Sequence, residues 1–259
     1  GHHVLYTATT GAEQDESSDQ SEFDSNIGWG ASSDFQTSST ESYMWKRSAG
    51  FDMVTYVGNS TGDYSGMSQV IPHNLGKSPE MIWCKRRDAS GYWGVYHKGL
   101  NGGTNPENYR LLLNDTHAES AASGSYTNWY WNNTAPTATH FSVGEVPNAN
   151  AQNTQIIAML FASVSGISHV GSYSGSGSTG NAQNIGFQPR YLLIKRRNAT
   201  SDWMQFNSVS GFDKYTQLNT NQQRNSQTYV NVSATGFSLV SDYGDTNESG
   251  STYIYYAHA

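Results

Sequence analysis

Met81-Ile82-Trp83-Cys84-Lys85-Arg86-Arg87 recurs in this chain as Tyr191-Leu192-Leu193-Ile194-Lys195-Arg196-Arg197. Each copy follows a proline, Pro79 or Pro189, and the offset between the copies is 110 for the proline and for the lysine (189−79 and 195−85). An apolar run of this length that breaks into Lys-Arg-Arg is typical of a buried strand running out to solvent. The repeat therefore predicts a duplicated β unit.

The composition favours the same class. The 259 residues are 36% hydrophobic and only 14% charged, and aromatic residues reach 13%. A chain this rich in aromatics and poor in charge is not disordered in general. Ser, Thr, Asn and Gly replace the missing charge, as in β proteins with many polar turns, and no useful helical period of apolar residues occurs.

The order of apolar segments is retraced in the second half of the chain. Strands are expected in the first half at 51–57, 81–87, 93–97, 109–114, 141–143 and 155–161, and in the second at 170–175, 191–197, 203–206, 215–219, 236–239 and 253–259. We expect an all-β protein of two tandem, duplicated antiparallel β-sandwich (jelly-roll-like) units, 48–164 and 165–259, with few or no helices.

Residues 1–47 differ from both units and form an acidic N-terminal segment that we expect to end in a strand at 43–47. The acidic residues are Glu13, Asp15, Glu16, Asp19, Glu22 and Asp24. Alternating carboxylates can converge on Ca²⁺, but the spacing lacks the glycine and distal glutamate of a calcium loop, which favours a solvated acidic loop. Residues 43–47 resemble the closing strand of each unit, so this segment is a candidate tail of an earlier unit.

Charge and hydropathy exclude several partners. A net charge of −7 argues against nucleic acid, which requires a basic surface. No apolar run approaches the roughly 18 residues of a membrane span, so no membrane insertion is expected. The single cysteine, Cys84, excludes an intrachain disulfide and is expected to be a small buried side chain.

The sequence gives no sign of catalysis, a metal or a cofactor. Metal-binding Cys/His spacing, His-Glu-x-x-His and Gly-x-Ser-x-Gly are all absent. The glycine-rich run 175–180 lacks the Lys-Ser/Thr of a phosphate loop and is expected to be a turn. Carboxylates that a glycosidase would need exist, but the sequence brings no pair of them together.

Two interpretations of the basic strand ends are open. The residues are Lys85, Arg86, Arg87, Lys195, Arg196 and Arg197. They could bind an anion such as an acidic sugar or a phosphate. Alternatively they are structural, because alternation puts Arg86 on the face opposite Lys85 and Arg87, where one side can close a buried ion pair. Since both copies keep the triplet, the structural interpretation is favoured.

An aromatic cluster in the first unit is the best binding candidate. Its members are Tyr126, Trp129, Tyr130, Trp131 and Asn132. Rigid aromatic side chains with interleaved amides suit carbohydrate or protein recognition. The counterpart at 228–231 is poorer in aromatics, so the shared fold does not require the cluster. A core or inter-unit contact is the equally weighted alternative.

The chain resembles a family of repeat domains in tail-fibre and other virion structural proteins of tailed bacteriophages, many of them from marine and cyanobacterial hosts. The residues that carry the resemblance include 45–56, 71–81, 85–88, 95–100, 111–115, 131–137 and 160–162, and 171–197 and 250–254 extend it into the second unit. The resemblance implies a phage virion part that is assembled in the host cytoplasm and extracellular in the free particle. It further implies a homo-oligomer, a trimeric fibre or adhesin tip, and contacts with other virion subunits.

Three functions follow as hypotheses. The first is a tail-fibre or adhesin module that binds a host surface polysaccharide without catalysis. The alternative is a purely structural virion component, such as a capsid decoration protein. A glycan depolymerase is the least favoured of the three.

Overall fold

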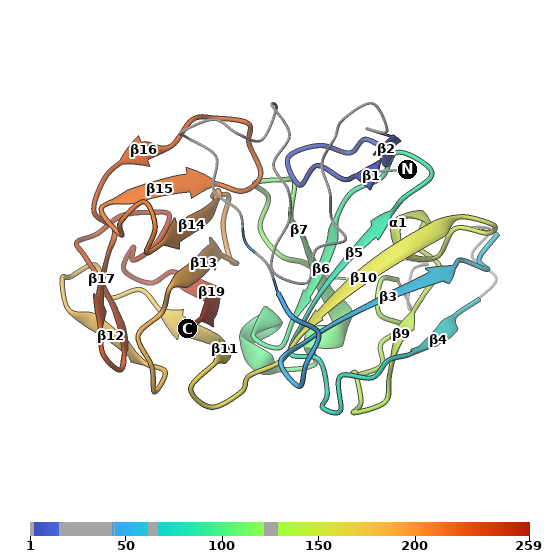
Figure 1. Ribbon diagram of the computed structural model, residues 1–259, viewed down its shortest axis with the longest axis horizontal. Coiled ribbons are helices and arrows are strands. Elements are labelled where there is room, and N and C mark those ends of the chain that lie inside the picture. Colours follow the sequence, from blue (N-terminus) through green and yellow to red (C-terminus); the bar gives the residue numbers. More distant parts are fainter. Residues whose placement is uncertain (1–2, 16–42, 44, 62–66, 122–128) are drawn as a thin grey trace.

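The chain folds almost entirely into antiparallel β-strands, arranged as two units side by side (Figure 1). The computed structural model describes residues 3–15, 43, 45–61, 67–121 and 129–259. The one α-helix in these residues is α1 (Pro147–Asn150), and two 3-10 helices, η1 (Leu100–Gly103) and η2 (Pro106–Asn108), join two strands of the first unit. No helix among them is long and apolar enough to cross a bilayer. The all-β prediction is confirmed.

The first unit is a sandwich of a large and a small sheet. The large sheet has the order β3 (Phe51–Val57), β10 (Gln155–Phe161), β5 (Met81–Arg86), β6 (Gly94–His97), β7 (Tyr109–Leu112) and β8 (Ser120–Ala121). The small sheet pairs β4 (Gln69–Pro72) with β9 (His140–Val143).

The second unit repeats this arrangement. Its large sheet has the order β11 (Ser168–Ser174), β19 (Thr252–His258), β13 (Tyr191–Arg196), β14 (Trp203–Asn207), β15 (Lys214–Gln217) and β16 (Asn225–Ser226). The small sheet has the order β12 (Asn181–Asn184), β18 (Gly236–Leu239) and β17 (Val230–Ser233). The two large sheets match strand for strand, which confirms the duplication.

The duplicated strands β5 and β13 lie inside their sheets. β5 is paired on one side with β10 and on the other with β6, and β13 is paired with β19 and β14 in the same way. Because side chains alternate along a strand, Met81, Trp83 and Lys85 share one face of β5, and Ile82 and Cys84 share the other. Both faces are buried in both copies, which accounts for the continuous apolar run in the sequence.

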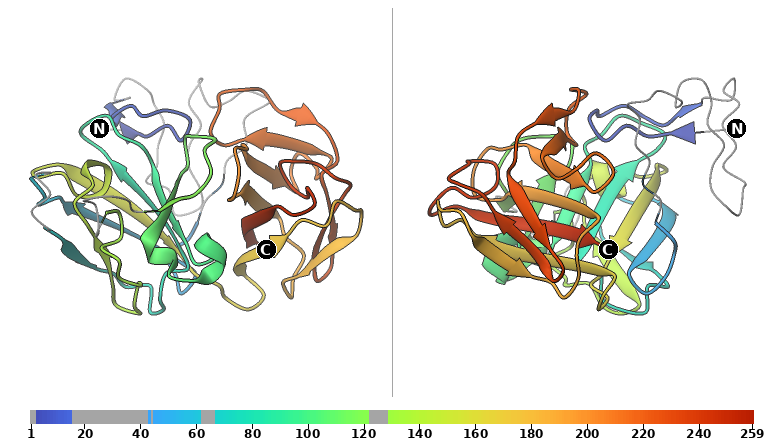
Figure 2. Two further views of the ribbon diagram at one scale, coloured as in Figure 1. Left: turned by 180° about the vertical axis from the view of Figure 1, so that it is seen from behind. Right: turned by 60° about the vertical axis from the view of Figure 1, so that its left-hand side comes forward.

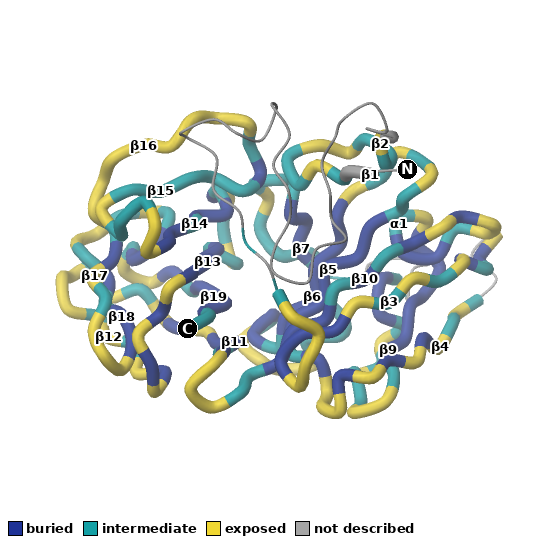
Figure 3. Tube along the Cα trace, viewed as in Figure 1, coloured by how far each residue is buried: buried dark blue, intermediate teal, exposed yellow. Residues whose placement is uncertain are grey.

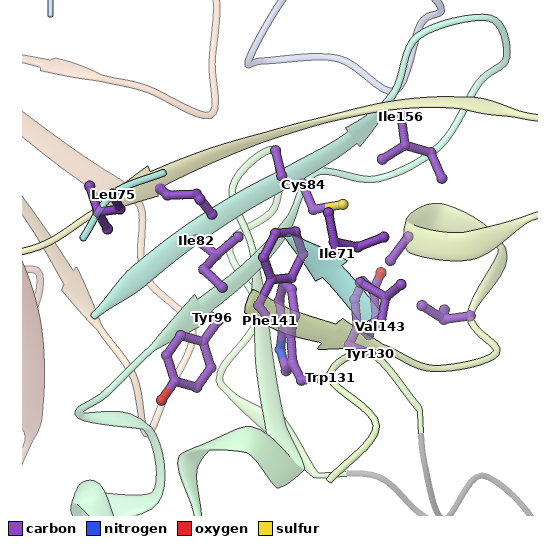
Figure 4. Packing of buried hydrophobic residues seen from close by; sticks show 14 of the residues in the cluster. Ile71, Leu75, Ile82, Cys84, Tyr96, Tyr130, Trp131, Phe141, Val143 and Ile156 are labelled. Atoms are coloured by element: carbon purple, nitrogen blue, oxygen red, sulfur yellow. The ribbon is translucent and has the colours of Figure 1, made fainter. Parts of the chain in front are cut away.

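Three apolar cores hold the four stacked sheets together, and the buried stretches of the chain are dark blue in Figure 3. One core lies inside each sandwich, and Figure 4 shows the one in the first unit. The third lies between the two large sheets, where the rings of Phe161 and Tyr256 approach to 5.0 Å between centroids. The two units are therefore packed face to face through their duplicated sheets.

The N-terminal segment differs from the prediction in part. β1 (His3–Val4) and β2 (Gln14–Asp15) form a hairpin that belongs to neither large sheet. No strand forms at the described residues of 43–47, contrary to expectation. The rings of Tyr43 and Trp45 instead pack edge-on against Tyr191, 4.9 and 5.7 Å between centroids, so this segment is held by side chains and not by a sheet partner.

Candidate functional site

A cavity of about 580 Å³ opens beside the β7–β8 hairpin of the first unit, next to the second unit. Its walls combine aromatic, charged and amide side chains, chiefly Tyr92, Arg110, Asp115, His117, Trp129, Tyr130 and Asn148. Arg110 lies on β7, Asp115 and His117 follow that strand, and Asn148 lies in α1. We call this cavity the Arg110 cleft.

Arg110 stacks on the aromatic wall of the cleft. Strand alternation directs Arg110 to the same face as Leu112, toward the segment that carries Trp129 and Tyr130. The Arg110 Cζ atom lies 4.7 Å from the centroid of the Trp129 ring and 5.7 Å from that of Tyr130. The two rings are 5.4 Å apart and edge-on. A guanidinium in this position is stabilised by the ring quadrupoles, by about 1 kcal/mol or more when desolvated.

The charge of Arg110 is not neutralised by an ion pair with any residue that the structure describes. Its Nε atom is buried and has no hydrogen-bond partner there. Burial lowers the pKa of Arg110, but an arginine side chain remains protonated in a protein. The cleft therefore presents a positive group that suits an anionic ligand.

Asp115 supplies an acceptor at the rim of the cleft. Its Oδ1 atom accepts hydrogen bonds from the Thr116 amide at 2.6 Å and the His117 amide at 3.3 Å, and His117 Nδ1 lies 2.6 Å away. Burial raises the pKa of the Asp115 carboxyl, but the bonds from His117 and Thr116 outweigh it and the net shift is downward. Asp115 is thus a fixed carboxylate.

Asn148 fixes the opposite wall. Its Oδ1 accepts a hydrogen bond from the Tyr92 amide at 3.1 Å, and its Nδ2 donates to the Tyr130 hydroxyl at 3.1 Å. The Tyr92 side chain is exposed at the rim. The cleft therefore has two accessible aromatic surfaces, Tyr92 and Trp129, with polar groups held in place between them.

The structure separates the members of the predicted aromatic cluster. Trp129 is partly buried and lines the Arg110 cleft. Tyr130 and Trp131 are buried in the core of the first unit, as Figure 4 shows, with Tyr130 also forming the floor of the cleft. Asn132 occupies a left-handed turn, with a φ of 53°. Tyr126 lies outside the described residues.

Sequence reasoning did not single out Arg110, Tyr92, Asp115, His117 or Asn148. One signal was present for Arg110, which is a charged residue in the apolar run 109–113, two positions from a core leucine. The other four come from separate loops and a helical turn. No spacing rule connects them, because only the fold brings them together.

The basic strand ends are engaged within the chain. Lys85 and Lys195 are fully buried. Lys85 Nζ donates to the Thr10 carbonyl oxygen at 3.3 Å, and Lys195 Nζ donates to the carbonyl oxygens of Thr116 and Ser201 at 2.9 and 2.6 Å. Burial lowers the pKa of each lysine to about 8.

The arginines of the triplets are also largely paired. Arg87 binds Glu13 through Nε at 2.5 Å and Nη2 at 2.9 Å, and Arg197 pairs with Glu119. Arg196, on the opposite face of its strand, pairs with Glu248. These contacts favour the structural interpretation of the triplets over anion binding.

A second cavity of about 580 Å³ lies between the N-terminal hairpin and the two large sheets. Its walls are mainly aromatic and aliphatic, and its two charged residues, Glu13 and Arg87, are paired with each other. It offers fewer polar groups for recognition than the Arg110 cleft. Among the residues described, no three His, Cys, Asp or Glu side chains converge to hold a metal ion. Of the acidic residues of the N-terminal segment, Glu13 is paired with Arg87, and those at 16–24 lie outside the described residues.

A comparison with protein families gives a match over most of the chain. The model of a family described as a domain of unknown function (DUF7483) matches residues 27–259, which include both β units and exclude the β1–β2 hairpin. No curated protein and no solved structure matches the chain. The chain belongs to the DUF7483 family.

Proposed function

We propose that this chain is a virion structural protein of a tailed bacteriophage, a tail-fibre or adhesin module that binds a host surface glycan without catalysis. The observation that carries glycan binding is the Arg110 cleft, where a guanidinium with no ion pair among the described residues stacks on Trp129 beside fixed polar groups. The phage setting rests on the resemblance of the sequence, and so do the proposed partners, which are other virion subunits and further copies of this chain in a trimer.

The chemistry of the cleft suits a sugar that carries an acidic group. The apolar face of a sugar ring packs on aromatic side chains, and its hydroxyls need donors and acceptors held at fixed positions. Asp115 and Asn148 are held by the hydrogen bonds described above. The fork of donors on Arg110 matches a carboxylate in two-point geometry. We therefore expect acidic glycans to bind more tightly than neutral ones.

The second unit lacks these charged groups. Gly94 and Met204 are equivalent in the repeat, and their strand partners are Leu112 and Gln217. Two residues before these partners lie Arg110 and Tyr215, so Tyr215 occupies the position of Arg110. By the same spacing, Thr220 and Gln222 replace Asp115 and His117. Tyr215 packs edge-on against Tyr229 at 5.1 Å between centroids, an aromatic contact where the first unit has a cation. Glycan binding is therefore proposed for the first unit alone.

A glycan array with acidic and neutral saccharides tests the proposal. Arg110→Gln and Trp129→Ala should each weaken binding of acidic glycans by about tenfold or more, since one lost charged contact is worth roughly 1.5–3 kcal/mol. Tyr215→Gln, the matched change in the second unit, should bind like the unaltered chain. Undiminished binding by both cleft variants would sink the proposal.

Burial of Tyr130 and Trp131 favours a second candidate, because it withdraws two aromatics from the surface. In this case the chain is a purely structural virion component such as a capsid decoration protein. Immunogold labelling of particles separates the two, because a tail fibre would be labelled at the tail and a decoration protein on the capsid wall. Release of reducing sugar ends from host polysaccharide would point to a depolymerase instead.

A further inference from the structure

Three hairpins of the chain share one geometry. Their outermost pairs are His3↔Asp15 in β1–β2, Tyr109↔Ala121 in β7–β8 and Lys214↔Ser226 in β15–β16, so each hairpin spans 13 residues. The β1–β2 and β7–β8 hairpins lie near the boundary between the units in Figures 1 and 2. The equal lengths indicate three copies of one element.

The β7–β8 hairpin docks on the second unit through its tip. Four hydrogen bonds form: Trp203 Nε1 to Leu112 O at 2.9 Å, Lys195 Nζ to Thr116 O at 2.9 Å, the Ser201 amide to Thr116 O at 2.9 Å, and the Glu119 amide to Arg197 O at 2.7 Å. The carboxylate of Glu119 also pairs with the Arg197 guanidinium. The β7–β8 hairpin thus binds the first unit to the second.

The β1–β2 hairpin docks on the first unit with the same set of contacts. The bonds are Trp93 Nε1 to Tyr6 O at 3.1 Å, Lys85 Nζ to Thr10 O at 3.3 Å, the Gly91 amide to Thr10 O at 2.8 Å, and the Glu13 amide to Arg87 O at 2.6 Å. Equivalent hairpin residues in the two sets differ in residue number by 106 throughout (112−6, 116−10, 119−13). Equivalent receiving residues differ by 110 throughout (203−93, 195−85, 201−91, 197−87). We call Lys85, Arg87, Gly91 and Trp93 the hairpin acceptor of the first unit.

The two docked hairpins differ in what anchors them. β7 is also paired with β6, so the β7–β8 hairpin is part of the first large sheet. β1 and β2 pair only with each other within the described residues. The sequence between this hairpin and Tyr43, which packs on Tyr191, is residues 16–42, whose fully extended length would be roughly 90 Å. Its covalent connection therefore permits docking on another molecule.

We propose that the hairpin acceptor also takes the β1–β2 hairpin of a second copy of this chain, so that copies are joined by exchange of N-terminal hairpins. The acceptor geometry already serves a hairpin from a different unit in the β7–β8 case. Exchange replaces each internal contact with an identical contact between molecules, which makes it a low-cost route to an oligomer. This proposal is independent of glycan binding.

The other hairpins are poor donors to this acceptor. The β7–β8 hairpin is fixed in its sheet. The β15–β16 hairpin carries Asn221 and Arg224 at the positions of Thr10 and Glu13, by the spacing of its outermost pair. Its arginine would face Arg87, and like charges at a docking contact are repulsive. The β1–β2 hairpin is therefore the one that fits the acceptor of a second copy.

Charge reversal in full-length chains tests the exchange. E13R and R87E each oppose like charges at the acceptor, so each variant alone should be monomeric by native mass spectrometry and light scattering. An equimolar mixture should form a heterodimer, because the E13R hairpin matches the R87E acceptor only between molecules. The double variant E13R/R87E should restore the concentration-dependent oligomer of the unaltered chain. E119R mixed with R197E should form no heterodimer, since that hairpin is fixed in its sheet.

A synthetic peptide of residues 1–15 provides a test that needs no altered protein. Labelled peptide should exchange into the unaltered chain, and an E13R peptide should bind about tenfold or more weakly, as expected for loss of one buried charged contact. The proposal is overturned if the unaltered chain stays monomeric at all concentrations and the peptide fails to exchange. Equal binding of both peptides would also overturn it, because the acceptor would then not be the docking site.

Discussion

His97 in β6 joins the two units by approaching Tyr255 in β19, with 3.3 Å between His97 Nε2 and the Tyr255 carbonyl oxygen. His97 Nδ1 accepts a hydrogen bond from the Gly99 amide at 2.9 Å. Both ring nitrogens are thus used by the neutral tautomer that is protonated at Nε2. Burial lowers the pKa of His97 to about 3, because a charged ring in this position would be desolvated and would lose the bond from Gly99.

His97→Asn should reduce the sensitivity of the fold to acid. The histidine is neutral in the folded state and charged in the unfolded state between pH 6.5 and about 3, so its contribution to stability is complete above pH 6.5 and is lost as the pH falls. At pH 5 this loss is about 2 kcal/mol. Asparagine fits the site because Asn207 accepts the equivalent bond, from the Val209 amide at 2.8 Å, in the second unit.

Urea unfolding at pH 7 and pH 5 measures this effect. His73, His169 and His258 also have pKa values lowered chiefly by burial, so the variant should retain part of the acid sensitivity. If the free energy of unfolding fell equally between pH 7 and pH 5 in the variant and the unaltered chain, His97 would not be a source of the acid sensitivity.

Glu119→Gln should destabilise the fold by about 2–4 kcal/mol, because it leaves the Arg197 guanidinium buried without its counter-charge. The side chains of Arg197 and Glu119 are only 15% and 12% exposed. Glu248→Gln is the matched control, since Glu248 is 41% exposed and its pair with Arg196 should contribute under about 1 kcal/mol. Chemical denaturation at pH 7 gives both values, and equal costs would contradict the assignment.

Lys195→Met should reduce the rise of stability between pH 8 and 9 by about half, because the pKa of Lys85 is also lowered to about 8 and contributes a similar slope. The pKa of Lys195 is lowered by burial from 10.5 to about 8, so the folded state loses its proton first and stability increases as the pH rises through this window. The slope from one such lysine is at most about 1.4 kcal/mol per pH unit. Above pH 9 the Cys84 thiol, whose pKa burial raises to about 12, acts in the opposite direction.

The slopes, and not the absolute stabilities, are to be compared, because methionine also lacks the bonds to Thr116 and Ser201. Lys214→Met, at a partly exposed side chain near Asp213, is the control for removal of a lysine. A slope in Lys195→Met as steep as in the unaltered chain would rule out this lysine as one of its sources.

Gly175→Ala should destabilise the second unit by several kcal/mol. A Cβ atom at this position would lie 2.1 Å from the Glu248 carbonyl oxygen, so the backbone itself would have to move. Gly250→Ala should cost only about 1–2 kcal/mol, since its φ of +78° is unfavourable for alanine but no atom lies within 4 Å of the added carbon. Thermal unfolding of the two variants ranks them, and a larger effect at Gly250 would contradict the close approach.

The strands and their duplication were readable from the sequence because both faces of β5 and β13 are buried, which makes each an apolar run. The alternation of side chains along a strand was enough to predict that Arg86 and Arg196 lie on the face opposite the neighbouring lysine. The strand predicted at 43–47 was wrong, because Tyr43 and Trp45 pack their rings on Tyr191 and their backbone joins no sheet.

The site was less predictable. Trp129 to Trp131 lie in an irregular segment, where no period tells a core side chain from a surface one. The docking of the hairpins could not be predicted from the sequence for another reason. On the hairpin side most contacts are made by backbone carbonyl oxygens, which every residue has. Glu13 and Glu119 are the hairpin residues whose side chains pair with the receiving arginines.

The face-to-face packing of the large sheets has a consequence for how the molecule melts. Phe51 and Met81 of one repeat and Tyr191 and Tyr256 of the other share a single core, so separating the repeats would expose a wall of aromatic rings on each. Neither repeat keeps its full complement of buried surface without the other. The duplication has therefore produced one cooperative folding unit and not two independent ones.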